Sequence, residues 1–179
     1  MDLKKEEYQN QNIPTTDTIR EYIDDNEHAN FPQVKIARRL SNKYRFFHWI
    51  LEFPEIFSRG GFDCIIGNPP FLGGLKISSI LGDKYRNYLN IIFAPFNDRP
   101  DLCVAFYRLG YSLLKKRGIL GLVATKTISQ GDSRQAGLEI ILRDQGTIIY
   151  AHRFIRWEGG AASIEVNLIS IYKGKWQGD

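Results

Sequence analysis

Two short apolar runs constrain the fold of this chain more than any other feature. Phe62–Ile66 follows a pair of glycines and ends at Gly67, and Ile119–Ala124 contains Ile, Leu and Val with no polar alternation. Runs of this length, without a polar face, are typical of strands that are buried within a sheet. We therefore expect both segments to be buried strands.

Helical spacing of apolar residues fills most of the remaining sequence. It predicts helices over residues 34–47, 75–93 and 133–145. A further helix begins near Pro100, with Lys115-Lys116-Arg117 in its last turn and Gly118 as its cap. Two closing strands, Thr147–Trp157 and Ile164–Tyr172, follow with no helix between them. This order predicts a mixed α/β sheet with helices on its faces and an antiparallel end.

The composition is that of a globular domain in a reducing compartment. Hydrophobic residues make up 43% of the 179 residues, and no apolar run approaches the roughly 18 residues that cross a bilayer. No apolar stretch follows Lys4 and Lys5, so we expect no secretory signal and a cytoplasmic location. Cys64 and Cys103 both lie among apolar residues, which predicts buried thiols. Without a CxxC, HExxH or His cluster, we expect no metal site.

Charge is distributed unevenly along the chain. Residues 1–30 carry eight acidic and three basic side chains, whereas the remainder carries 12 acidic and 21 basic ones. A basic body suits a polyanionic partner, although an ordinary solvated surface explains it equally well.

The segment directly after the first apolar run has the composition of a site. In Gly67-Asn68-Pro69-Pro70-Phe71 the prolines end sheet pairing and fix the backbone. Asn68 and Phe71 are then held beyond the carboxyl end of a strand, where open α/β sheets bind ligands. A structural Pro-Pro turn is the alternative for the NPP triplet alone.

This segment resembles the catalytic motif of adenine-N6 DNA methyltransferases of the large restriction–modification and phage-defence type. The resemblance includes Phe46-Phe47-His48-Trp49, residues 51–57 and Thr127–Asp132, and it covers roughly residues 44–174. It implies a partial Rossmann-like, class I SAM-dependent methyltransferase sheet. Residues 44–179 would form the C-terminal half of the catalytic domain, after a polar extension over residues 1–43. Lys126 departs from the pattern, which has Asn between Thr125 and Thr127.

The resemblance also implies roles for individual residues. The Asn68 side chain and the Pro69 carbonyl would accept hydrogen bonds from the adenine amino group, with Pro70 fixing the turn. Phe71 would stack on an adenine flipped out of double-stranded DNA. Trp157 could cover its other face, although a Trp that packs a loop against the body explains it equally well. Asp101 falls where the family places residues near S-adenosylmethionine, although a helix-start aspartate explains it equally well.

The Gly-rich loop that holds the methyl donor in this family is not found in the sequence. Gly60-Gly61, Gly73-Gly74 and Gly159-Gly160 do not form a strand–GxG–helix unit. We therefore expect part of a split or larger enzyme, with a second chain supplying the Gly-rich half and the sequence-recognition region. The alternatives are a catalytically inactive remnant, a DNA-binding accessory subunit, or an enzyme that methylates an amide in protein or RNA.

Overall fold

The computed structural model describes residues 20–21, 24, 32–157 and 164–178. The chain divides into two compact units, Met1–Glu52 and Phe53–Asp179. The predicted boundary between residues 43 and 44 stays a prediction.

Within the first unit, the clearest element is helix α3 (Pro32–Tyr44). It agrees with the helix predicted over residues 34–47 but ends earlier, because Arg45 adopts a positive φ of 48°. Phe47 and Trp49 pack edge to face with ring centroids 5.0 Å apart, and Trp49 begins the short helix α4 (Trp49–Glu52).

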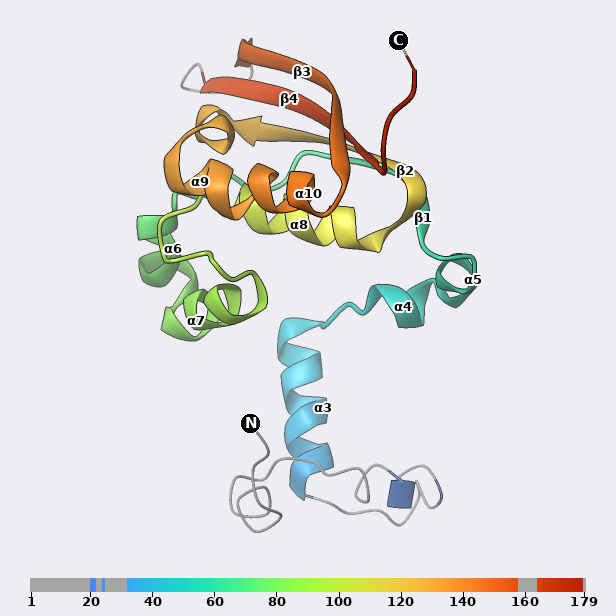
Figure 1. Cartoon of the computed structure of the whole chain (residues 1–179). Helices are drawn as coiled ribbons and strands as arrows, with labels where there is room; N and C mark the ends of the chain where they lie inside the picture. Colours follow the sequence, from blue (N-terminus) through green and yellow to red (C-terminus); the bar gives the residue numbers. More distant parts are fainter. Residues whose placement is uncertain (1–19, 22–23, 25–31, 158–163, 179) are drawn as a thin grey trace. The chain divides into compact units, whose positions relative to one another are not determined.

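The second unit is built on a four-stranded sheet (Figure 1). Its strands are β1 (Phe62–Gly67), β2 (Leu114–Thr125), β3 (Gly146–Trp157) and β4 (Ile164–Lys173), in the order β1-β2-β4-β3. β1 and β2 are parallel, and β4 runs antiparallel to both β2 and β3. The expected fold class, a partial Rossmann-like mixed sheet with an antiparallel end, is confirmed.

Helices cover one face of this sheet. Figure 1 shows α8 (Cys103–Leu113), α9 (Gly131–Ala136) and α10 (Leu138–Arg143) together on one side, with α5 (Pro54–Ser58) before β1. On β2 the buried side chains Leu120, Leu122 and Ala124 alternate with more exposed ones. The hydrophobic core therefore lies between the sheet and these helices.

Among the described helices of the second unit, none covers the other face of the sheet. A shallow hollow of about 270 Å³ lies there, lined by residues that include Cys64, Ile66, Val123 and Leu168. Ile66 is 83% exposed and the thiol of Cys64 is exposed as well. The predictions of a fully buried strand at residues 62–66 and of a buried Cys64 are therefore wrong, because β1 packs on one side only. The buried thiol predicted for Cys103 is confirmed.

Glycines divide two of the predicted helices. Residues 75–93 form α6 (Gly74–Leu81) and α7 (Asp83–Ile92), because Gly82 interrupts them with a φ of 87°. Residues 133–145 form α9 and α10, which meet at Gly137 (φ −111°, ψ −91°). A Cβ on Gly137 would lie 2.9 Å from the Ser133 carbonyl oxygen, so the chain bends at a residue without one.

The predicted helix C-terminus at Lys115–Gly118 is also wrong. α8 ends at Leu113 and these residues belong to β2. Phe62 pairs with Leu114 and Cys64 pairs with Ile119, so the intervening basic residues bulge out of the ladder. Lys115 pairs with Asp63 and holds the pKa of that carboxyl below its usual range.

The 3-10 helix η1 (Lys126–Ser129) follows β2. Among the described helices, none has the length and apolarity needed to cross a membrane.

Candidate active site at the carboxyl edge of the sheet

The chemistry-bearing residues meet at one edge of the sheet. β1 and β2 are parallel, and β3 points the same way because both β2 and β3 are antiparallel to β4. The carboxyl ends of β1, β2 and β3 therefore lie at the same edge as the beginning of β4. This edge brings Asn68-Pro69-Pro70-Phe71 to the same side of the sheet as Lys126 and Trp157.

The four motif residues have different environments. Asn68 and Pro70 are exposed and Pro69 is buried, so the turn is anchored through its first proline. Phe71 is half-buried and packs against the hydrophobic core, as does Leu72. The motif thus presents the polar side chain of Asn68 beyond β1, while Phe71 is held by its contacts with the hydrophobic core.

The segment before α8 holds the backbone of this turn in place. The Leu102 amide donates a hydrogen bond of 2.8 Å to the Leu72 carbonyl. Gly74 lies against the same segment, where a Cβ would be 2.5 Å from the carbonyl carbon and oxygen of Arg99. Only glycine permits this approach of two backbones.

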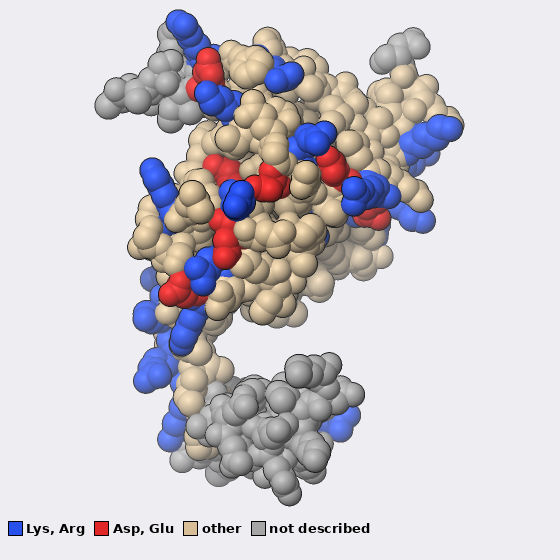
Figure 2. All heavy atoms as spheres, turned by 60° about the vertical axis from the view of Figure 1, so that its left-hand side comes forward, with Lys and Arg blue, Asp and Glu red and all other residues tan. Residues whose placement is uncertain are grey.

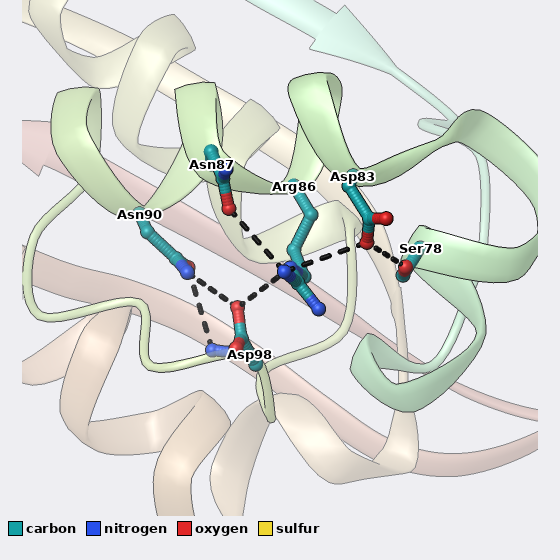
Figure 3. Close-up of polar contacts among 6 residues, drawn as sticks. All are labelled: Ser78, Asp83, Arg86, Asn87, Asn90 and Asp98. Atoms are coloured by element: carbon teal, nitrogen blue, oxygen red, sulfur yellow. Dashed lines mark hydrogen bonds and ion pairs between the residues drawn. The ribbon is translucent and has the colours of Figure 1, made fainter.

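A polar network fixes that supporting segment (Figure 3). Asp98 Oδ1 accepts a hydrogen bond from the Asn90 side chain and lies 3.6 Å from Arg86 Nε, so two residues of α7 hold it. Arg86 also lies 3.4 Å from Asp83, which accepts a hydrogen bond from Ser78 of α6. These contacts connect α6, α7 and the segment on which Gly74 rests.

Asp101, the residue predicted near the cofactor, is buried at the start of α8. Its Oδ1 accepts a 3.0 Å hydrogen bond from the Cys103 amide, and its own amide donates to Ser133 Oγ at 3.1 Å. These contacts explain Asp101 as a helix-start residue, and its contact with the cofactor stays a prediction.

Cys103 lies beside Asp101 but is not suited to nucleophilic chemistry. Burial, with a smaller contribution from the neighbouring Asp101 charge, raises the pKa of this thiol far above its usual value. Cys103 Sγ lies 4.0 Å from Thr125 Oγ1 at the end of β2, and Thr125 Oγ1 is 2.7 Å from Thr127 Oγ1. The neutral thiol is therefore a packing group beneath the edge.

Asn167 is a site residue that the sequence analysis did not identify. Its side chain is fully buried, accepts a hydrogen bond of 3.1 Å from the Phe154 amide, and donates at 3.5 Å to the Lys126 carbonyl. It therefore connects β3 and β4 to the end of β2. Asn167 lies between the apolar residues Val166 and Leu168, and a polar residue at that place in a strand is the signal that could have revealed it.

Trp157 is the remaining predicted site residue, and no role is predicted for the histidines His28 and His152. Trp157 is the last residue of β3, and its side chain is outside the described part of the structure. His152 is exposed, with Nδ1 3.4 Å from the Tyr150 hydroxyl, and His28 is outside the described residues. Across the described ranges, no three His, Cys, Asp or Glu side chains gather as metal ligands.

The surface charge of this region is mixed. Figure 2 turns toward the viewer the side to which the β2 arrow points in Figure 1. Basic and acidic side chains interleave across this side of the second unit, without one large patch of a single sign. A polyanion would therefore meet individual cations here.

Comparison with known proteins identifies similar methylases. The model of a family described as the Eco57I restriction-modification methylase matches residues 2–161. The Type II methyltransferase M.BstVI of Geobacillus stearothermophilus is 36% identical over 64 residues, which are 36% of this chain and 11% of that protein. A solved structure of the Type IIL restriction-modification enzyme MmeI in complex with DNA matches with a TM-score of 0.49 and 22% identity. That match covers 64% of this chain and 16% of the solved chain. The chain therefore spans a small part of the length of either protein.

Proposed function

Because the chain belongs to the Eco57I restriction-modification methylase family, we propose that it carries the base-binding part of a DNA methyltransferase acting on the N6 amino group of adenine. The observation that carries the proposal is the place of Asn68-Pro69-Pro70-Phe71, directly after β1 at the carboxyl edge of a parallel strand pair. Open α/β sheets bind their ligands at this edge.

The chemistry requires acceptors rather than an acid or a metal. The adenine amino nitrogen is a weak nucleophile because its lone pair is delocalised into the ring. The side-chain oxygen of exposed Asn68 and the Pro69 carbonyl would each accept a hydrogen bond from one N–H of the amino group. These two bonds would localise the nitrogen lone pair in the direction of the methyl group to be transferred. Buried Pro69 keeps these acceptors fixed, so little reorganisation is needed when the amino group becomes cationic.

Aromatic contacts would hold the base itself. A flipped adenine needs surfaces on its two faces to replace the stacking lost in the duplex. Phe71 would supply one of them from its half-buried position, and Trp157 at the end of β3 would supply the other. In this proposal the substrate is double-stranded DNA and the product is N6-methyladenine.

S-adenosylmethionine is the methyl donor that the family implies, and it supplies an electrophilic methyl group on a sulfonium. The described residues do not form its cradle. Gly60 and Gly61 lie before β1, at the opposite end of the strand from the motif, and Gly74 is closed off by the Arg99 backbone. We propose that another part of the protein, or a second chain, supplies the Gly-rich loop and the sequence-recognition region.

A catalytically inactive remnant or a DNA-binding accessory subunit is the second candidate. The observation that favours it is that the Asp101 carboxylate already accepts a hydrogen bond from the Cys103 amide, within the protein itself. Calorimetry with S-adenosylmethionine separates the two candidates, because a remnant gives no heat of binding even with the Gly-rich part present. An enzyme that methylates protein or RNA amides would instead leave DNA without N6-methyladenine.

Substitution of Asn68 tests the proposal directly. In the complete protein, Asn68→Ala should abolish methyl transfer while Asn68→Asp, which keeps an acceptor oxygen, should retain measurable activity. The measurement is N6-methyladenine in treated DNA by mass spectrometry of nucleosides. Retention of more than about a tenth of the activity by Asn68→Ala corresponds to a loss below ~1.4 kcal/mol and would overturn the assignment.

A further inference from the structure

Three charged residues lie in a row across the carboxyl edge of the sheet. Lys126 follows the last residue of β2, and its Nζ is 3.5 Å from Glu165 Oε2 on β4. Arg156 of β3 lies directly opposite Glu165 in the β3–β4 ladder, so the two side chains share one face. The Glu165 carboxylate is therefore paired with Lys126 and has Arg156 on the neighbouring strand.

The ion pair in this row is exposed. The side chain of Lys126 is 55% exposed and that of Glu165 is 44% exposed, so water screens their attraction. Exposed pairs of this kind contribute little to stability. Lys126 can therefore exchange Glu165 for an incoming anion at little cost to the fold, and exposed Arg156 lies across the ladder from the same carboxylate.

A bulge beside the row presents further groups at the same edge. Arg153 and Phe154 together face Asn167, because the ladder pairs His152 with Leu168 and then Ile155 with Val166. Phe154 has a positive φ of 59° and is 49% exposed, with the Arg153 guanidinium 4.6 Å from its ring centre. A non-glycine residue in this conformation is costly, and such strain gathers at functional sites. The Phe154 amide is held by the buried Asn167 side chain.

We propose that Lys126 and Arg156 bind backbone phosphates of the DNA strand that carries the target base, with Glu165 paired with Lys126 when DNA is absent. The proposal rests on the function proposed above, because it places the two cations at the edge that also carries Asn68 and Phe71. A phosphate supplies the same anionic oxygens that Glu165 offers. The row thus anchors the strand beside the base pocket through contacts that are independent of sequence.

Asn167 is a positioning residue in this arrangement. It reaches the Lys126 carbonyl and the Phe154 amide from the interior, so it sets the ends of β2 and β3 relative to one another. Glu165 opposes DNA binding, because its negative charge repels a phosphate and competes with it for Lys126. Removing Glu165 and removing Lys126 should therefore change DNA affinity in opposite directions.

The salt dependence of DNA binding tests the proposal in the complete protein. Each lost phosphate contact should reduce the slope of log K against log salt concentration by about 0.9. Lys126→Ala and Arg156→Ala should each show that reduction and a raised KM for DNA with kcat unchanged, whereas Glu165→Gln should bind DNA more tightly at low salt. Lys116→Ala, an exposed lysine near the amino end of β2, is the matched control and should leave the slope unchanged.

The outcomes separate this inference from the proposed function. A purely structural ion pair predicts that Lys126→Ala and Glu165→Gln weaken DNA binding alike, and that result overturns the phosphate contacts. An unchanged slope in both cation variants of an enzyme that still needs Asn68 overturns this inference alone. Failure of the unmodified protein to bind or methylate DNA overturns both.

Discussion

The side chain of Phe71 is shared between the protein core and the proposed base pocket, and a substitution can separate the two roles. Phe71→Ala should weaken flipping of the target base, because base–aromatic stacking is worth about 1–3 kcal/mol. Phe71→Tyr keeps the ring and should be tolerated. Fluorescence of a duplex with 2-aminopurine at the methylated position measures flipping in the complete protein.

The control for this prediction accounts for the packing contribution of the ring. Phe93 is also half-buried against the same core, but it lies at the end of α7, away from the motif. Phe93→Ala should lower the free energy of unfolding without changing flipping. Equal flipping by Phe71→Ala and the unmodified protein would show that Phe71 only packs.

Cys103 gives a prediction for the pH dependence of stability. The unfolded thiol ionises near its ordinary pKa of about 8.5, whereas burial raises the pKa of the folded thiol well above that. The stabilisation from the protonated thiol is therefore complete below pH ~8.5 and is lost progressively as pH rises toward the folded-state pKa.

Urea unfolding at a series of pH values measures this effect. Between about pH 8.5 and 10, Cys103 should contribute a decline of up to ~1.4 kcal/mol per pH unit. Cys103→Ala should unfold at lower urea throughout but lose this part of the decline, in a Cys64→Ser background that excludes oxidation of the exposed thiol. Parallel curves for the two proteins would contradict the assignment.

At the scale of secondary structure, the start of α6 depends on the close approach of its backbone to that of Arg99. Substitutions of the two neighbouring glycines, Gly73 and Gly74, test this dependence. Gly74→Ala would place a Cβ 2.5 Å from the Arg99 backbone and push the turn at Asn68–Phe71 away from its support. We expect a loss of about 1–3 kcal/mol in stability and reduced methyl transfer. Gly73→Ala is the matched control, because nothing lies within 4 Å of its Cβ and its φ is −58°.

Urea midpoints and methyl-transfer rates of the two variants give the comparison. Gly73→Ala should behave as the unmodified protein in both measurements. If Gly74→Ala did the same, the segment around Arg99 would not be the support of the turn at Asn68–Phe71.

The elements that sequence predicted well are those whose pattern is local. β2, β3 and β4 follow from runs of apolar residues, and the antiparallel end follows from the absence of a helix between the last two strands. Periodicity alone did not locate the breaks at Gly82 and Gly137, because both lie inside continuous apolar spacing. The backbone conformations of Gly82 and Gly137 depend on the change of direction between the helices on either side, which the spacing of apolar residues does not encode.

The candidate site was predictable to the extent that it lies on one continuous segment. Asn68 to Phe71 follow a strand, so their place at its carboxyl end could be expected. Asn167 and Glu165 reach the same edge because β4 is antiparallel, and that depends on pairing between segments distant in sequence. The Gly74–Arg99 contact likewise depends on a tertiary approach that no local pattern encodes.

At the scale of the whole molecule, the second unit exposes an apolar sheet face and an edge strand. β1 is the outermost strand of the described sheet, and Ile66 is 83% exposed on its open side. An edge strand with exposed apolar side chains is a template for pairing with another chain. We expect the chain by itself to associate through Phe62–Ile66 or to be poorly soluble, and to bind S-adenosylmethionine weakly or not at all.

Light scattering and cofactor calorimetry measure these two properties. Co-expression with a Gly-rich partner segment should restore solubility and cofactor binding together. Alkylation of Cys64, exposed in this chain, should then slow, because the partner covers that face. A stable monomer with micromolar affinity for S-adenosylmethionine would contradict the expectation.

The direction of β4 has a consequence for how such proteins can diverge. Because β4 runs against both of its neighbours, the chain leaves the sheet after Trp157 and re-enters it at Ile164 on the same edge as Asn68. Residues can be added, removed or exchanged between these two points without shifting any ladder register. New contacts can therefore arise beside the proposed base pocket while the sheet next to them stays constant.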